Sequence, residues 1–141
     1  MLTVVEKVIV LQNVNIFAEV PTEQLSLLAV VAEEVSYTSE STVYKENDIA
    51  DALYLVLEGK VILERNNNEI AVADSGEAFG TWALFDEEPR VVTARVKEDC
   101  HLLRIDREDF VDLLADHVQI AQGILKTMVN RLRGLVERTS H

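Results

Sequence analysis

Residues 76–93 read GEAFGTWALFDEEPRVVT and interrupt a region that otherwise alternates in the manner of β-strands. Residues 82–85 have helical character, and a short helix that begins just after Gly80 presents N–H groups and the positive end of its dipole. Arg90 returns about ten residues later and can clasp a phosphate through its N–H donors. The stretch therefore predicts a site for a small phosphate ester, whereas the simpler interpretation is a surface arginine paired with a carboxylate of residues 87–88.

The region around this stretch, residues 35–105, is predicted to form many short strands. Val, Ile, Tyr and Leu alternate with polar residues, and turn residues separate the runs. Glu58-Gly59 is short enough for a hairpin turn, and asparagines 66–68 predict another turn because asparagine tolerates positive φ. This rhythm is typical of a sandwich, a roll or a barrel. The runs cover residues 35–38, 42–45, 52–57, 60–65, 69–73, 91–97 and 101–105.

Residues 1–34 are predicted to be helical. Thr22 follows a proline and can cap a helix, and leucines and alanines then repeat at helical spacing. A shorter helix is expected before it. Ile16 and Phe17 lie between the two helices and are predicted to anchor this segment in a core.

Residues 107–138 carry another helical pattern with a heptad seam of apolar residues. A second apolar stripe lies beside the seam, so the helix can pack on its own domain and still contact a partner. We therefore expect a homodimer through this helix, and the alternative is a long core helix that bends over the roll. Gly123 costs about 1 kcal/mol of helix stability and is a candidate for a bend. The seam consists of Leu114, Val118, Ala121, Leu125, Met128, Leu132 and Leu135, and the second stripe of Leu113, Ile120, Ile124 and Val129.

The composition narrows the possible functions. The chain has 141 residues, enough for one domain, and its net charge is −12. Proteins that bind nucleic acid need a face rich in Lys and Arg, so nucleic acid is not an expected partner. Cys100 is the single cysteine, which fits a reducing compartment. The N-terminus does not resemble a signal peptide and no apolar run approaches the ~20 residues of a membrane helix, so we expect a cytoplasmic protein without membrane insertion.

No catalytic or metal-ligating cluster is found in the sequence. His101, His117 and His141 are far apart and lack the spacing of a cupin-type metal enzyme. Cys100 precedes His101, but neighbours on a strand point to opposite faces and do not form a catalytic pair. A nucleophile elbow and a phosphate-binding P-loop are both missing. The prediction is a protein that is not an enzyme and has no metal or cofactor.

Residues 76–93 resemble the phosphate-binding cassette of the cyclic nucleotide-binding domain family, whose pattern is roughly Phe-Gly-Glu-x-Ala-Leu, a variable turn and Pro-Arg-x-x-Thr. The similarity extends over nearly the whole chain. It implies a single domain, residues 1–141, that is mainly β: an eight-stranded jelly roll (a double-stranded β-helix, or β-roll) with N-terminal helices and a long C-terminal helix, without the DNA-binding domain of the cAMP-receptor type. The matching residues are Phe79, Gly80, Ala83, Leu84, Pro89, Arg90 and Thr93.

The resemblance implies a regulatory module that binds a cyclic mononucleotide and signals by movement of its C-terminal helix. Arg90 would hold the cyclic phosphate, and the backbone N–H groups of Ala83 and Val91 would share it. The favoured ligand is cAMP, because family members that prefer cGMP often carry Thr where this chain has Val91. The partner would be a second copy or an effector domain outside this sequence. The implied ligand-binding residues are Phe79, Gly80, Thr81, Trp82, Ala83, Arg90 and Val91, with Leu63 and Ile70 near the base and Met128 capping it.

Thr81 is the largest departure from the family. A glutamate is usual there, and its carboxylate accepts a hydrogen bond from the ribose 2′-hydroxyl. Losing a hydrogen bond to a charged partner costs about 1.5–3 kcal/mol, or roughly 10- to 150-fold in affinity. Glu40 and Asn47 also stand where glycines are usual, and positive φ is easier for Asn than for Glu. The alternative function is therefore a structural or dimerisation module that no longer binds cyclic nucleotides.

Overall fold

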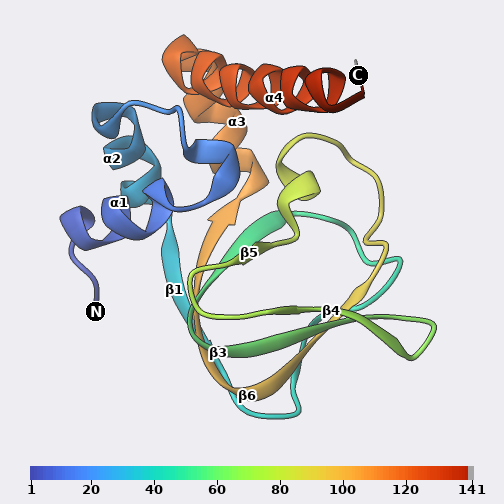
Figure 1. Ribbon diagram of the computed structural model, residues 1–141. Coiled ribbons are helices and arrows are strands. Elements are labelled where there is room, and N and C mark those ends of the chain that lie inside the picture. Colours follow the sequence, from blue (N-terminus) through green and yellow to red (C-terminus); the bar gives the residue numbers. More distant parts are fainter. Residues whose placement is uncertain (140–141) are drawn as a thin grey trace. The chain divides into compact units, whose positions relative to one another are not determined.

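Two long antiparallel strands, β3 (Ala52–Arg65) and β6 (Thr93–Asp106), form the centre of the sheet in the computed structural model, which describes residues 1–139 (Figure 1). Their pairing begins with Ala52 opposite Asp106 and ends with Glu64 opposite Thr93. The described residues give a six-stranded antiparallel sheet, so the predicted strand-rich region between helical segments is confirmed. The strands paired with β6 are β1 (Glu33–Tyr37) and β2 (Thr42–Tyr44), and those paired with β3 are β4 (Asn68–Ala73) and β5 (Ala78–Phe79).

β3 and β6 each join two of the seven predicted runs, and β5 was not among these runs. The described part of the sheet therefore has six strands where eight were expected. The predicted hairpin at Glu58-Gly59 is wrong, because β3 continues through these residues. The register of its pairing with β6 shifts here, and Gly59 has φ +101°. A Cβ at Gly59 would lie 2.6 Å from the carbonyl oxygen of Asp99. Glycine thus forms an irregularity within the strand and lets the two backbones approach closely.

Positive φ angles occur at the asparagines of the second predicted turn and at the two positions where glycine is usual in the family. Asn66 (φ 53°) and Asn67 (φ 66°) join β3 to β4, which confirms this turn. Asn47 and Glu40 both have φ 72°. The left-handed region costs a non-glycine residue roughly 1–2 kcal/mol. At Glu40 an ion pair between its carboxylate and Arg95, 3.1 Å apart, accompanies this unfavourable backbone conformation.

Aromatic side chains from three strands meet in the core of the sheet. The rings of Tyr54 and Phe79 stack with centroids 5.3 Å apart, and Tyr44 lies 6.1 Å from each of them. All three residues are buried. This cluster joins β2, β3 and β5 and forms the base on which the candidate site is built.

The chain divides into two compact units. Residues 31–111 form the β unit, and residues 2–30 together with the segment after residue 111 form the helical unit. Ile16 and Phe17 are buried, which confirms the predicted anchors. Thr3 caps the first helix in a reciprocal bond pair with Glu6, and the second helix begins at Thr22. The helices are α1 (Val4–Gln12), η1 (Asn15–Phe17), α2 (Thr22–Val31), α3 (Arg107–Asp116) and α4 (Val118–Thr139).

The predicted C-terminal helical segment is divided at His117, between α3 and α4. Leu114 therefore lies on a different helix from the rest of the heptad seam. Gly123, expected at a bend, lies within the continuous helix α4, where a Cβ would come within 2.8 Å of the main chain of Glu19 and Val20. Its missing side chain thus allows close packing of α4 in the helical unit. None of the helices in residues 1–139 has both the length and the apolar character that a bilayer crossing requires.

Candidate functional site

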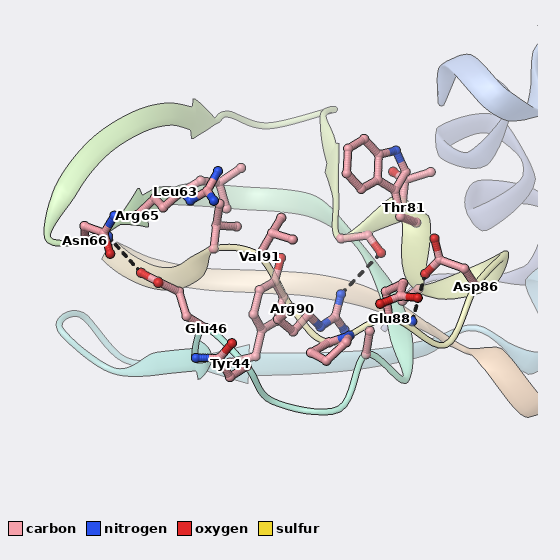
Figure 2. A pocket seen from close by; sticks show the side chains of 17 residues that line it. Tyr44, Glu46, Leu63, Arg65, Asn66, Thr81, Asp86, Glu88, Arg90 and Val91 are labelled. Carbon is pink, nitrogen blue, oxygen red and sulfur yellow. Dashed lines mark hydrogen bonds between the residues drawn. The ribbon is translucent and has the colours of Figure 1, made fainter.

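A hollow of about 760 Å³ opens in the β unit (Figure 2). Its lining residues come from within three segments: 44–50, 63–66 and 80–92. Small-ligand sites commonly measure about 300–1,000 Å³ and combine apolar walls with a few polar groups. The hollow has the size and the mixed lining of such a site.

Arg90 is the buried cation of the hollow, with only 6% of its surface exposed. Its Nη2 donates to the carbonyl oxygen of Ala52 at 2.8 Å. Its Nη1 donates to the carbonyl oxygen of Gly80 at 3.4 Å (Figure 2). A carboxylate oxygen of Asp51 lies 3.7 Å from Nη2. The simpler interpretation, a surface arginine paired with Glu87 or Glu88, therefore does not describe this side chain.

The main chain of Arg90 is held as firmly as its side chain. The Arg90 N–H donates to the carbonyl oxygen of Asp48, and the Asn47 N–H donates to the carbonyl oxygen of Arg90, both at 2.8 Å. The two bonds tie this residue to the connection between β2 and β3. Hydrogen bonds therefore hold both the backbone and the guanidinium of Arg90 in place.

The Nε of Arg90 is buried and has no hydrogen-bond partner among the described residues. A guanidinium also carries more N–H donors than its bonds to Ala52 and Gly80 use. Leaving a buried charged donor unpaired costs free energy. An anion beside the guanidinium would be stabilised by its charge and its unused donors.

The segment before Arg90 forms the predicted helical turn, here the 3-10 helix η2 (Thr81–Leu84). Gly80 caps it in the left-handed region with φ 72°, and the Ala83 N–H donates to the Gly80 carbonyl oxygen at 3.2 Å. Trp82 is 71% exposed, so most of its indole faces solvent and leaves the hollow open. The turn thus brings Thr81 and the Gly80 carbonyl to the hollow that holds Arg90.

Acidic side chains also line the hollow, and backbone N–H groups occupy two of them. Glu46 accepts from the Asn66 N–H at 2.9 Å, and Asp86 accepts from the Glu88 N–H at 3.2 Å. Figure 2 shows Glu46 and Asn66 at one end of the hollow and Asp86 and Glu88 at the other. These bonds partly satisfy both carboxylates before any ligand arrives.

Seven of the ten predicted site residues line the hollow. Phe79 does not, because its ring is stacked on Tyr54 in the core. Ile70 lies on β4, is 58% exposed and is outside the lining. Met128 belongs to α4 in the helical unit. The seven are Leu63, Gly80, Thr81, Trp82, Ala83, Arg90 and Val91.

Sequence reasoning missed Tyr44 and Ala52, whose contacts hold Arg90. Tyr44 ends β2, and its ring centroid lies 3.9 Å from the Cζ of Arg90. Ala52 contributes only a carbonyl oxygen. A main-chain acceptor has no residue-type signal, and neither position is close to Arg90 along the chain.

The histidine and the cysteine of β6 have separate surroundings. Cys100 is buried, and its thiol donates to main-chain carbonyls. Burial raises the pKa of this thiol. His101 contacts Ser36 at 2.9 Å and Glu34 at 2.7 Å on β1. In the part of the chain described, no three His, Cys, Asp or Glu side chains gather as a metal site; His141 lies outside the described residues.

Comparison with known proteins identifies the surrounding domain. The family model described as "Cyclic nucleotide-binding domain" matches residues 34–117, more than half of the chain. The chain is 31% identical to the cyclic AMP receptor protein of Thermus thermophilus over 116 residues, which are 79% of this chain and 54% of that protein. It is 26% identical to a CRP-like cAMP-activated global transcriptional regulator of Mycobacterium tuberculosis over 129 residues, which are 88% of this chain and 58% of that protein. The chain thus spans somewhat more than half the length of these two relatives.

A solved structure supports the fold. The N-terminal domain of a transcriptional regulator from Streptomyces coelicolor superposes with a TM-score of 0.83 and is 32% identical in sequence. The match covers 91% of this chain and 95% of that one. The predicted jelly-roll fold with flanking helices is confirmed.

Proposed function

Because the chain belongs to the cyclic nucleotide-binding domain family, we propose that the hollow around Arg90 binds a cyclic mononucleotide and that the domain acts as a regulatory sensor. The observation that carries this proposal is the buried Arg90 guanidinium, which lines a hollow of ligand size and whose Nε lacks a hydrogen-bond partner. A cyclic phosphate has the charge and the acceptor oxygens to fill this position. Thr81, Trp82 and Ala83 of η2 line the same hollow and are its proposed neighbours.

Among cyclic nucleotides we favour cAMP. The residue after the arginine, Val91, has no hydroxyl to bond a guanine base. Val91 and Leu63 both line the hollow and offer apolar surface to an adenine ring. Both curated relatives reported above carry cAMP in their names, which adds support.

Signalling is proposed to pass through the C-terminal helix. A ligand can move such a helix only if it binds the protein more tightly when the helix is in one position than when it is in the other. Met128 on α4 is the candidate to contact the base in the bound state. Leu125 and Leu132 of the heptad seam are exposed and are the proposed contacts to a second copy or to an effector domain. The free thiol of Cys100 supports a location in the reducing cytoplasm.

Titration of the protein with cAMP is expected to give saturable binding in the micromolar range, with cGMP binding more weakly. Trp82 is the single tryptophan, and it lies at the hollow, so its fluorescence reports ligand binding directly. Calorimetry gives an independent dissociation constant. Adenosine, which lacks the phosphate, is the matched control and should not bind. Absence of binding at millimolar cAMP would contradict the proposal.

A glycine pair tests whether Arg90 must keep its place. Gly80 (φ 72°) and Gly76 (φ 89°) both have positive φ, but a Cβ meets the Arg90 Nη1 at 2.7 Å only at Gly80 and meets nothing within 4 Å at Gly76. Each alanine substitution should cost about 1–2 kcal/mol of stability from the backbone alone. Only Gly80→Ala should also weaken cAMP binding, by roughly tenfold, because it displaces a charged hydrogen-bond donor. Thermal melts and titrations measure both effects, and an equal loss of binding in Gly76→Ala would refute the positional argument.

A second candidate function is a structural module that dimerises without binding nucleotides. Thr81, neutral and short where the family usually has glutamate, is the observation that favours it. Sedimentation analysis with and without cAMP separates the two candidates. A dimer that ignores millimolar cAMP supports the structural module, and saturable binding excludes it.

A further inference from the structure

Tyr44 forms an aromatic platform beneath the guanidinium of Arg90. It is the last residue of β2 and is 7% exposed. The Cζ of Arg90 lies 3.9 Å from the centre of the Tyr44 ring, well inside the roughly 6 Å at which a cation and a ring face attract each other. Two further rings, Tyr54 and Phe79, each lie 6.1 Å from that of Tyr44. The platform is therefore itself held by the core.

This contact limits the orientations that the guanidinium can take. The group is planar, and its N–H bonds lie in the plane. Tyr44 supports one face, while the carbonyl oxygens of Ala52 and Gly80 accept from Nη2 and Nη1. The Nε is buried and has no hydrogen-bond partner among the described residues. The donor is thus oriented before the ligand binds.

The platform stays neutral over the working range of pH. Burial raises the pKa of Tyr44 to about 12, against the smaller opposing effect of the Arg90 charge. The phenol therefore remains protonated, and an arginine side chain does not lose its charge in a protein. The attraction between the ring face and the cation persists at any pH at which the protein would work.

We propose that Tyr44 is a positioning residue of the anion site, which aligns the Arg90 guanidinium for a phosphate and thereby raises affinity. This inference rests on the proposed function. It assigns to the ring face a role distinct from core packing. A preoriented donor loses less conformational freedom when the ligand binds. The ring, not the hydroxyl, carries this role.

Three variants separate positioning from packing. Tyr44→Phe keeps the ring, Tyr44→Leu removes it, and Tyr54→Leu removes a ring from the same cluster that contacts Arg104 instead of Arg90. Without the ring the guanidinium must be ordered when the ligand binds, so Tyr44→Leu should raise the dissociation constant for cAMP by roughly tenfold. Tyr44→Phe and Tyr54→Leu should stay within about threefold of the unsubstituted protein. Thermal melts of all three establish that loss of stability does not explain the ranking.

A measurement without ligand tests the contact itself. The Nε–H resonance of Arg90, assigned by its loss in Arg90→Lys, should be shifted upfield by the ring current of Tyr44. The shift should persist in Tyr44→Phe and vanish in Tyr44→Leu, with Tyr44→Met as the replacement if the leucine variant does not fold. An unshifted resonance in the unsubstituted protein overturns the inference. So does unchanged cAMP affinity when the ring is removed.

The two proposals fail in different ways. If the unsubstituted protein binds no cAMP, the proposed function fails, and the role assigned to Tyr44 fails with it, whatever the resonance shows. If the protein binds cAMP and Tyr44→Leu binds it equally well, only the role of Tyr44 is refuted. If Tyr54→Leu weakens binding as much as Tyr44→Leu does, the effect belongs to the core and the positioning role is refuted.

Discussion

Replacing Arg90 with glutamine is expected to weaken cAMP binding by at least about 100-fold. Two charge-assisted hydrogen bonds from the guanidinium to the phosphate, at roughly 1.5–3 kcal/mol each, are lost. Glutamine retains a donor and much of the side-chain length but not the charge. Titration followed by Trp82 fluorescence and by calorimetry measures the change. A circular dichroism melt shows whether the roll still folds without the bonds from Arg90 to Ala52 and Gly80.

Arg65→Gln is the matched control for this experiment. Arg65 lines the same hollow and carries the same charge, but it is exposed and makes none of the buried contacts of Arg90. An exposed charge contributes little, so its loss should change affinity by less than about fivefold. If both variants lose affinity equally, non-specific electrostatic attraction between the phosphate and positive charge at the hollow explains the binding. If neither does, the phosphate does not bind at Arg90.

Restoring the usual glutamate, Thr81→Glu, is expected to tighten cAMP binding by roughly 10- to 150-fold, the value of one hydrogen bond to a charged partner. Thr81 lies in the lining of the hollow on η2, so a longer acidic side chain there reaches the same space. Calorimetry measures the gain. A large gain would mean that the rest of the pocket is already built for a ribose.

The ligand itself provides the control for Thr81→Glu. With 2′-deoxy-cAMP the hydroxyl is missing, so the gain should disappear. Thr81→Gln, which has the same length without the charge, should recover only about 0.5–1.5 kcal/mol. Weaker binding of both ligands would show that the new carboxylate pairs with Arg90 and blocks the phosphate. An equal gain for the two ligands would contradict the role assigned to the 2′-hydroxyl.

Much of the fold could be predicted because its signals are local. Asn66 and Asn67 mark a tight turn, and the run after Gly80 forms the expected short helix. The error at Gly59 has a non-local cause. Glycine between two apolar runs is typical of a hairpin, but the backbone of Asp99, distant in sequence, passes close to it and keeps the strand continuous. Two-residue strand β5 was also missed, since its pairing with β3 determines it.

The candidate site likewise combines residues that local sequence patterns identify with residues that only the folded sheet brings together. Gly80, Thr81, Ala83 and Arg90 lie within one short stretch, and its residue types indicate an anion site. Tyr44 and Ala52 reach Arg90 only through the folding of the sheet. Ile70 was expected at the hollow, but residue types on a strand do not decide which face of a twisted sheet borders a cavity.

The pairing of β3 with β6 has a consequence for biosynthesis. Ala52 lies opposite Asp106, so the pairing of β3 with β6 cannot be completed until residues well beyond 76–93 have emerged from the ribosome. Ladders between such distant segments generally form in milliseconds to seconds. A nascent chain therefore carries β3 with an open edge while its partner is still being translated, and it gains a place for a ligand only after β6 has been synthesised.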